Sequence, residues 1–280
     1  MSLPSLKCAL LLAFVLAACR PAQQAPAGRE PTDAPRSEPA LPVAEPALDR
    51  EALLLMQARA ASAAALGQDD GKIQADWDGQ RFEVRLRFGC NGATASNATA
   101  PRRWTVDGER RVLRLHVAPD IDSATPLIEA VGGPVFEAVE GFWIERPWQL
   151  ADGCPQARAA SSSSAVAATS EAGRPAPTVA PQLPRVGIAQ FFTQTDPRTH
   201  RRDHRAYEAT ETIDPDEQLS ASGYNLVLSG RLRLPPNGRV IACVVDHVDA
   251  PPACVASVKF DKVAIELPDR EKTLAEWAAG

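Results

Sequence analysis

The sequence predicts a mainly β fold with two or three short helices, arranged as one or two small antiparallel domains of the sandwich or barrel type, with an α+β fold as the alternative. Two observations favour this class. Apolar and charged residues alternate with a period of two from Phe82 to Phe88 and again from Arg231 to Leu234, which places the apolar residues on one face of a strand. Turn signals of the Asp-Gly and Asn-Gly type separate such runs, because these residues tolerate the positive φ of tight hairpins.

Residues 1–18 have the proportions of a secretory leader. Lys7 supplies a positive charge, and residues 8–16 form an apolar run of about nine residues, well short of the roughly 20 that span a bilayer. The sequence Leu16-Ala17-Ala18-Cys19 resembles the lipobox of bacterial lipoprotein precursors, and an ordinary secretory signal is the alternative. The resemblance implies that residues 1–18 are removed and that Cys19 is lipidated. Because Arg20, rather than Asp, follows Cys19, it further implies the outer membrane, facing the periplasm.

Residues 19–48 form a predicted Pro-rich tether. Ala, Glu and Gln surround regularly spaced prolines, which are Pro21, Pro26, Pro31, Pro35, Pro39, Pro42 and Pro46. Such a composition buries little apolar surface and favours extended polyproline II. At ~3.1 Å per residue the tether reaches up to roughly 90 Å from its anchor.

The overall charge restricts the classes of partner. The chain carries 30 basic and 35 acidic side chains, a formal net charge of −5. Such a chain has no global attraction to nucleic acid, so we expect no nucleic-acid partner. The membrane partner is expected through the lipid anchor alone.

Four cysteines remain after Cys8 leaves with the leader and Cys19 takes lipid. An even number in an oxidising compartment predicts disulfides, and four cysteines allow three pairings. We favour Cys90 with Cys154 and Cys243 with Cys254, because a low-complexity segment lies between the two pairs. A zinc site is the competing use, but no Cys-x-x-Cys spacing is present.

Residues 49–155 are expected to form an N-terminal helix and a β-rich domain. A helix is predicted from Arg50 to Leu66, with Asp49 as its N-cap and Gly67 at its end. Strands are predicted at 82–88, 104–106, 113–117 and 142–144, with a short helix at 122–131.

Residues 156–184 read as an Ala/Ser/Pro-rich linker, with four consecutive serines at 161–164. Residues 185–280 are expected to form a β-rich C-terminal domain. Strands are predicted at 224–228, 232–234, 240–245, 254–260 and 263–267, with Gly230 as a possible bulge and 240–245 as a central strand.

Catalytic signatures are largely absent from the sequence. No nucleophile elbow, Ser-x-x-Lys, phosphate loop, His-Glu-x-x-His or EF-hand pattern occurs, and the chain has four histidines. His200 and His204 with Asp203 approximate an inverted zinc-protease pattern, which makes a metal-dependent envelope hydrolase the alternative function. Against it, the neighbouring arginines repel a divalent cation and favour a solvated basic loop. We therefore expect neither an enzyme nor a cofactor.

Three further groups are candidate binding residues. Arg201 and Arg202 are candidates for contact with an anion, such as a lipopolysaccharide phosphate or an acidic partner. Trp143 and Trp148, with Glu140 and Glu145, are candidates for a sugar-stacking surface. Asp214, Asp216 and Glu217 are candidate calcium ligands, although an acidic turn is usually only solvated.

A second, short resemblance concerns the segment after the first predicted strand. Phe88-Gly89-Cys90-Asn91-Gly92 resembles the Gly-Cys-Asn motif of META-type (HslJ-like) lipoprotein domains, which are small β-rich envelope modules. It covers five residues and implies no functional residue. The preferred hypothesis is therefore a lipid-anchored envelope protein of binding or structural type that recognises a protein or glycan, including peptidoglycan, with an inhibitor or immunity role among the possibilities.

Overall fold

The computed structural model describes residues 46–133, 135–155, 184–214, 222–245, 247, 249–270 and 272–279. The predicted leader, Cys19, almost all of the tether, and the linker up to residue 183 lie outside the described residues. Of the tether, residues 46–48 are described, and Leu48 pairs in parallel with Phe82. The described structure therefore includes residues before the predicted boundary at residue 49.

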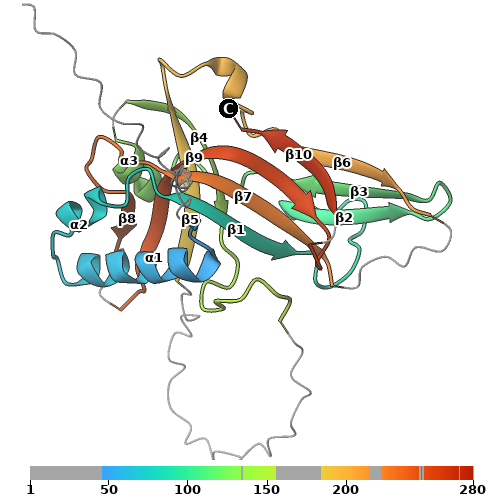
Figure 1. The fold of residues 1–280 in the computed structure, drawn as a ribbon, viewed down its shortest axis with the longest axis horizontal. Coiled ribbons are helices and arrows are strands. Elements are labelled where there is room, and N and C mark those ends of the chain that lie inside the picture. The colour runs from blue at the N-terminus through green and yellow to red at the C-terminus, as the bar shows by residue number, and fades with distance from the viewer. Residues whose placement is uncertain are drawn as a thin grey trace, which may run out of the picture. The chain divides into compact units, whose positions relative to one another are not determined.

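The fold is mainly β with short helices, as the sequence predicts (Figure 1). In the described part, the helices are α1 (Arg50–Ala65), α2 (Gly71–Ala75) and α3 (Pro126–Gly132), with a 3₁₀ turn η1 (Arg198–His200). The strands are β1 (Arg81–Phe88), β2 (Arg102–Asp107), β3 (Val112–Val117), β4 (Phe136–Trp143), β5 (Arg185–Thr193), β6 (Tyr207–Thr212), β7 (Tyr224–Leu232), β8 (Ile241–Val244), β9 (Ala253–Glu266) and β10 (Thr273–Ala278). No helix among these residues is long and apolar enough to cross a membrane.

The strands form two sheets. The larger sheet has seven strands, with the order β1-β7-β9-β5-β4 and with β8 and β10 added along β9. The smaller sheet has the order β2-β3-β6. The pairings between these strands are antiparallel, as expected, except that of β5 with β9, which is parallel.

The predicted halves at 49–155 and 185–280 are not separate domains. β1 pairs with β7, β4 pairs with β5, and β3 pairs with β6, so each sheet contains strands from both halves. Residues 44–280 accordingly form a single compact unit. A break in composition does not show which strands pair when those strands lie far apart in the chain.

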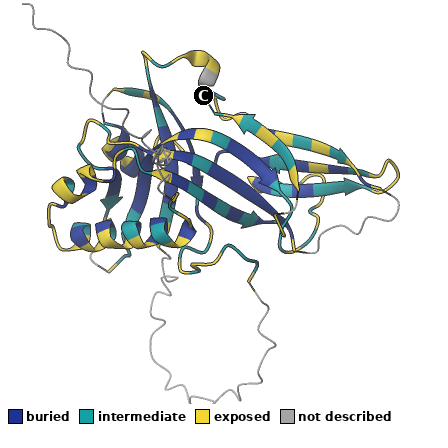
Figure 2. Cartoon of the chain, in the orientation of Figure 1, coloured by how far each residue is buried: buried dark blue, intermediate teal, exposed yellow. Residues whose placement is uncertain are grey.

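Helices cover both faces of the large sheet. α1 packs over β8, β9 and β1, and α3 packs over β9 and β8. The residues of α1 join a core that includes Phe82, Leu226 and Phe260, whereas those of α3 join a second, smaller cluster with Val139 and Val255. Figure 2 shows the result, a buried inner face and an exposed outer face on α1.

Local sequence explains where the helices begin and end. The side chain of Asp49 accepts a hydrogen bond of 2.9 Å from the Ala52 N–H, and Gly67 follows α1 with a φ of +62°, as predicted. α3 begins after Thr125, whose hydroxyl accepts from the Ile128 N–H. It is shorter than the predicted helix because Pro126 occupies its first turn.

A bulge joins the two apolar runs at 254–260 and 263–267 into one strand. Ser229 pairs with Lys262 and Gly230 with Phe260, so Asp261 is the extra residue on β9. The extra residue reverses the alternation, and Phe260 and Val263 therefore both face the same core. Gly230 is required opposite it, because a Cβ there would lie 2.1 Å from the Lys259 carbonyl oxygen.

Several elements escape sequence prediction. β5, β6, β10 and α2 carry no clear alternating or capped pattern, and tertiary pairing supplies their structure. The predicted central strand at 240–245 is an edge strand, since β9 is the one described strand that pairs with β8. The side chain of Gln74 in α2 accepts a hydrogen bond of 2.7 Å from the N–H of Ile241, the first residue of β8.

Both disulfides are present with the favoured pairing. Cys90 is bonded to Cys154, and Cys243 is bonded to Cys254. The second pair staples β8 to β9 at a position where the two residues lie directly opposite each other. The first pair fixes the end of the segment that follows β4.

Candidate binding loop

The segment from Ile144 to Cys154 leaves β4 and carries two exposed apolar side chains. We call it the clamped loop. The side chain of Trp148 is 58% exposed and that of Leu150 is 43% exposed. The loop begins where the Ile144 N–H donates a hydrogen bond of 2.7 Å to the Val186 carbonyl, and it ends at the disulfide between Cys90 and Cys154.

One buried guanidinium holds the loop from beneath. Arg50, the first residue of α1, donates to the carbonyl oxygens of Glu145, Arg146 and Gln149 at 2.8, 3.1 and 2.9 Å. Burial, followed by the neighbouring Arg146, lowers the pKa of Arg50. A cation at a helix N-terminus is unfavourable for the helix dipole, so the contact with the loop, and not the helix, accounts for an arginine here.

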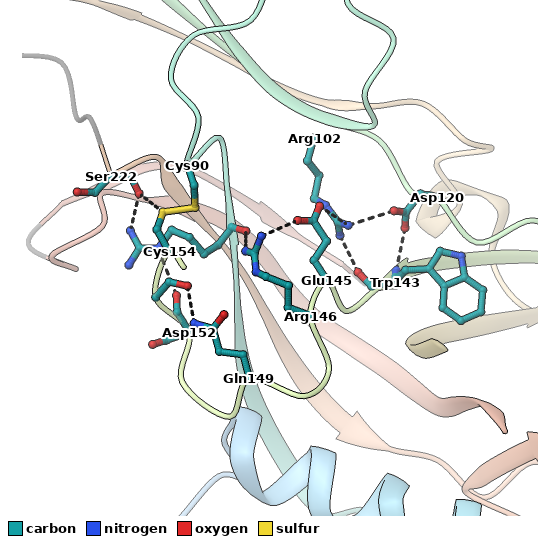
Figure 3. A network of polar contacts seen from close by, with 12 residues as sticks. Cys90, Arg102, Asp120, Trp143, Glu145, Arg146, Gln149, Asp152, Cys154 and Ser222 are labelled. Atoms are coloured by element: carbon teal, nitrogen blue, oxygen red, sulfur yellow. Dashed lines mark hydrogen bonds and ion pairs between the residues drawn. A yellow bond between two sulfur atoms is a disulfide. The ribbon is translucent and has the colours of Figure 1, made fainter. Parts of the chain in front are cut away.

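A second group of contacts fixes the far end of the loop. Arg87 on β1 donates to the Asp152 carbonyl at 3.2 Å, and the Asp152 carboxylate pairs with Arg270 at 2.8 Å. The amide of Gln149 donates to the Gly153 carbonyl at 3.0 Å. Figure 3 shows Gln149 and Asp152 near the disulfide.

A third group holds the entry to the loop. Arg102 on β2 donates to the Trp143 carbonyl at 2.9 Å and pairs with Asp120 and Glu145 at 3.2 and 3.1 Å (Figure 3). Asp120 in turn accepts a hydrogen bond of 2.8 Å from the Trp143 N–H. Burial raises the pKa of Asp120, and the Arg102 charge opposes that rise.

The loop backbone is consequently held at both ends and in the middle. The cavity beneath it has a volume of about 10 Å³, enough for one water molecule. Arg146 adopts a φ of +52°, a conformation that a non-glycine residue adopts only when its surroundings hold it. The arrangement presents Trp148 and Leu150 to solvent on a rigid support.

The four residues of the predicted sugar-stacking surface do not come together. Trp143 is half-buried, packs against the α3 cluster and lies under the Arg185 guanidinium, 4.2 Å from the ring centre. Glu140 is buried and accepts a hydrogen bond from the Tyr207 hydroxyl. Glu145 is paired with Arg102. Trp148 and Glu145 are exposed, whereas Trp143 is half-buried and Glu140 is buried, so the four residues do not form the expected surface.

The two candidate anion-binding arginines fold their own segment. Arg201 is buried, pairs with Glu137 at 2.8 Å and donates to the Thr193 carbonyl. Arg202 lies over the Tyr207 ring at 4.1 Å and donates to the Ala206 carbonyl. The solvated basic loop expected here is therefore wrong for Arg201, whose charge is neutralised by a partner distant in sequence.

The metal candidates receive little support from the described residues. His204 is exposed, with a φ of +63°, while the side chain of His200 and the residues Asp216 and Glu217 lie outside the described residues. Asp214 lies at the end of its described segment, and its carbonyl accepts a hydrogen bond from Arg111. Within the part that the structure describes, no group of three or more His, Cys, Asp or Glu side chains converges.

Comparison with known proteins adds no assignment, because no family model, curated protein or solved structure matches this chain. Sequence reasoning identified Trp148 as a candidate but missed Arg50. The signal that could have identified Arg50 is its position directly after the N-cap Asp49, because the helix dipole disfavours a cation there.

Proposed function

We propose that this chain is a lipid-anchored envelope protein of the binding type, held through Cys19 to the periplasmic face of the outer membrane, and that it binds a partner protein through the clamped loop. The observation that carries the binding role is the 58% exposed Trp148 on a loop whose backbone is held by Arg50. The lipobox-like Leu16-Ala17-Ala18-Cys19 and the two disulfides support the location.

The physical argument is preorganisation. Binding normally costs the entropy of ordering loops and side chains, and a loop that is already fixed avoids most of that cost. Tryptophan is the residue type most enriched at the energetic centres of protein interfaces, where a polar rim excludes water from it. Arg146 and Asp152, which lie two residues from Trp148 and Leu150 in the chain, are both ion-paired and supply charged groups on the same loop.

A protein is favoured over a glycan because of the carboxylates. A sugar-binding surface pairs an aromatic ring with polar groups that are free to accept hydroxyl hydrogens. Here both carboxylate oxygens of Glu145 are engaged, by Arg102 and Arg146, and the exposed Leu150, two residues from Trp148 in the chain, is apolar. Two apolar side chains with a charged rim match the composition of a protein interface.

Photocrosslinking tests the binding role. A photoreactive amino acid replaces Trp148 in one strain and Leu66 in another, because Leu66 is 70% exposed and lies at the end of α1, outside the loop. A discrete adduct from position 148 and none from position 66 is expected. With the identified partner, Trp148→Ala should weaken binding at least about 30-fold, and Leu66→Ala less than about twofold. Equal effects of the two substitutions would sink the proposal.

Fractionation tests the anchor independently. The Cys19→Ser variant should appear in the soluble periplasmic fraction, whereas the unaltered chain should be recovered with outer membranes, because acyl chains supply the membrane affinity. Mass spectrometry of the N-terminal peptide should show acylated Cys19. A chain that is soluble with Cys19 intact would contradict the lipoprotein assignment and leave the interaction of the clamped loop untouched.

A further inference from the structure

The large sheet opens into a groove where β5 leaves β9. The two strands pair in parallel only as far as Gln190 and Val258. Beyond this point β5 continues beside β4, and a groove of about 480 Å³ lies between the end of β5, β9 and the segment after β7. That volume lies within the range of small-molecule sites, roughly 300 to 1,000 Å³.

Apolar side chains line one part of the groove. Phe136 and Phe191 form an edge-to-face pair with ring centres 5.6 Å apart, and both pack over Gly132, where a Cβ would lie 2.4 Å from Phe136 and 2.7 Å from Phe191. Val135 and Leu234, which are 53% and 38% exposed, lie at the rim. The absence of a side chain at Gly132 is what allows the two rings to reach this position.

Basic side chains line the other part of the groove. Arg233 and Lys259 line the groove, and Arg231 lies directly opposite Lys259 in the β7–β9 register. Like charges in directly opposed positions destabilise a sheet. None of these three cations forms an ion pair with a carboxylate among the described residues. The one acidic residue in the lining, Asp196, accepts hydrogen bonds from the Thr193 N–H and hydroxyl.

Three backbone groups along the opening are already bonded. The Thr193 N–H donates to Asp196, and the Thr193 carbonyl accepts from Arg201. The Phe260 N–H donates to the side chain of Gln190 at 2.8 Å, which closes the ladder where the two strands part. An added peptide strand would need such groups free, so the groove suits a ligand that makes no backbone hydrogen bonds.

We propose that this groove binds a fatty-acid-class lipid, with the alkyl chain along Phe136, Phe191 and Leu234 and the carboxylate at Arg233 and Lys259. An alkyl chain needs no hydrogen bonds. A carboxylate compensates the positive charges of Arg233 and Lys259 through charge-assisted hydrogen bonds. The volume accommodates a single chain rather than a two-chain phospholipid. This site is separate from the clamped loop and does not depend on the function proposed for it.

Calorimetric titration with laurate below its micellar concentration tests the proposal. The full mature chain is used with Cys19→Ser, so that acyl groups of the anchor cannot compete. One laurate per chain is expected, with decanol binding at least about tenfold more weakly because it lacks the charge, and acetate showing no measurable binding because it lacks the chain.

Two matched double variants locate the site. Arg233→Gln with Lys259→Gln should weaken laurate binding at least about tenfold. Arg103→Gln with Arg114→Gln should leave binding unchanged, since that pair lines a different hollow on the small sheet. Leu234→Ser, an exposed change that should leave the protein folded, should weaken laurate binding, because it removes an apolar contact with the alkyl chain. Equal binding by both double variants, binding of acetate as tight as that of laurate, or no laurate binding by the folded chain would each overturn the proposal.

Discussion

Replacing Arg50 by alanine tests whether one guanidinium holds the clamped loop. The change removes charge-assisted hydrogen bonds to the carbonyl oxygens of Glu145, Arg146 and Gln149. Each such bond stabilises by about 1 kcal/mol net, because a carbonyl that loses it can regain water. The change also removes an unfavourable interaction of about 0.5 kcal/mol between the arginine and the helix dipole. The unfolding free energy should therefore fall by about 2.5 kcal/mol.

Urea denaturation measures this loss, and Arg59→Ala is the matched control. Arg59 lies on the same helix and is exposed, so its removal should change the unfolding free energy by less than about 0.5 kcal/mol. Hydrogen exchange supplies a local readout, since the amides of the clamped loop should lose protection in Arg50→Ala and not in Arg59→Ala. If Arg50→Ala and Arg59→Ala behave alike in both measurements, the clamp that we describe does not exist in solution.

The remaining predictions concern a buried carboxyl and a glycine. Burial raises the pKa of Glu140, although the Tyr207 hydroxyl and Arg202 oppose that rise. A folded pKa above the unfolded value of 4.5 means that the native state binds the proton more tightly, so the stability that Glu140 contributes is fully present below pH 4.5 and is lost as pH rises through the raised pKa. Urea curves at several pH values should show this fall in the unaltered chain and a shallower one in Glu140→Gln; a difference between the two that is independent of pH would contradict the assignment. For the glycine, Gly230→Ala places a Cβ 2.1 Å from the Lys259 carbonyl oxygen, while nothing lies within 4 Å of a Cβ at Gly108. The first change should destabilise by about 3 kcal/mol or more and Gly108→Ala by less than about 0.5 kcal/mol, as measured by urea unfolding, and a tolerated Gly230→Ala would show that the bulge is formed differently.

Local features of the sequence account for the elements predicted correctly. Asp49 and Gly67 delimit α1 through hydrogen bonding and a positive φ, and both act within a few residues of themselves. The alternation at 82–88 places one face of β1 in the core because side chains on a strand alternate whatever the strand pairs with. The disulfide pairing was predicted from the break in composition, and each bonded pair does lie on one side of that break.

Only part of the candidate site could be predicted from the sequence, because burial and ion pairing depend on residues that are distant in the chain. The exposure of Trp148 depends on which surroundings the fold brings to it, and the sequence offered Trp143 as an equal candidate. Likewise, Arg201 belongs to a run of arginines that suggests a solvated loop, yet Glu137 from β4 neutralises and buries it. Charges that pair across long sequence separations carry no periodic signal.

The sequence alone determined the class of the fold, the bounds of its best-patterned elements and the expected destination of the chain, because periodicity, capping and leader motifs are all local. Only the tertiary structure decided that strands from both halves share each sheet, that β5 joins β9 in parallel, and that Arg50 holds a loop some 95 residues away. These depend on which distant segments pair, a choice made by the packing of the whole core rather than by any one segment. The same pairing ends at Gln190 and Val258, where β5 leaves β9 and the groove lies. The exposed Trp148 lies on a separate loop that is held by residues outside it.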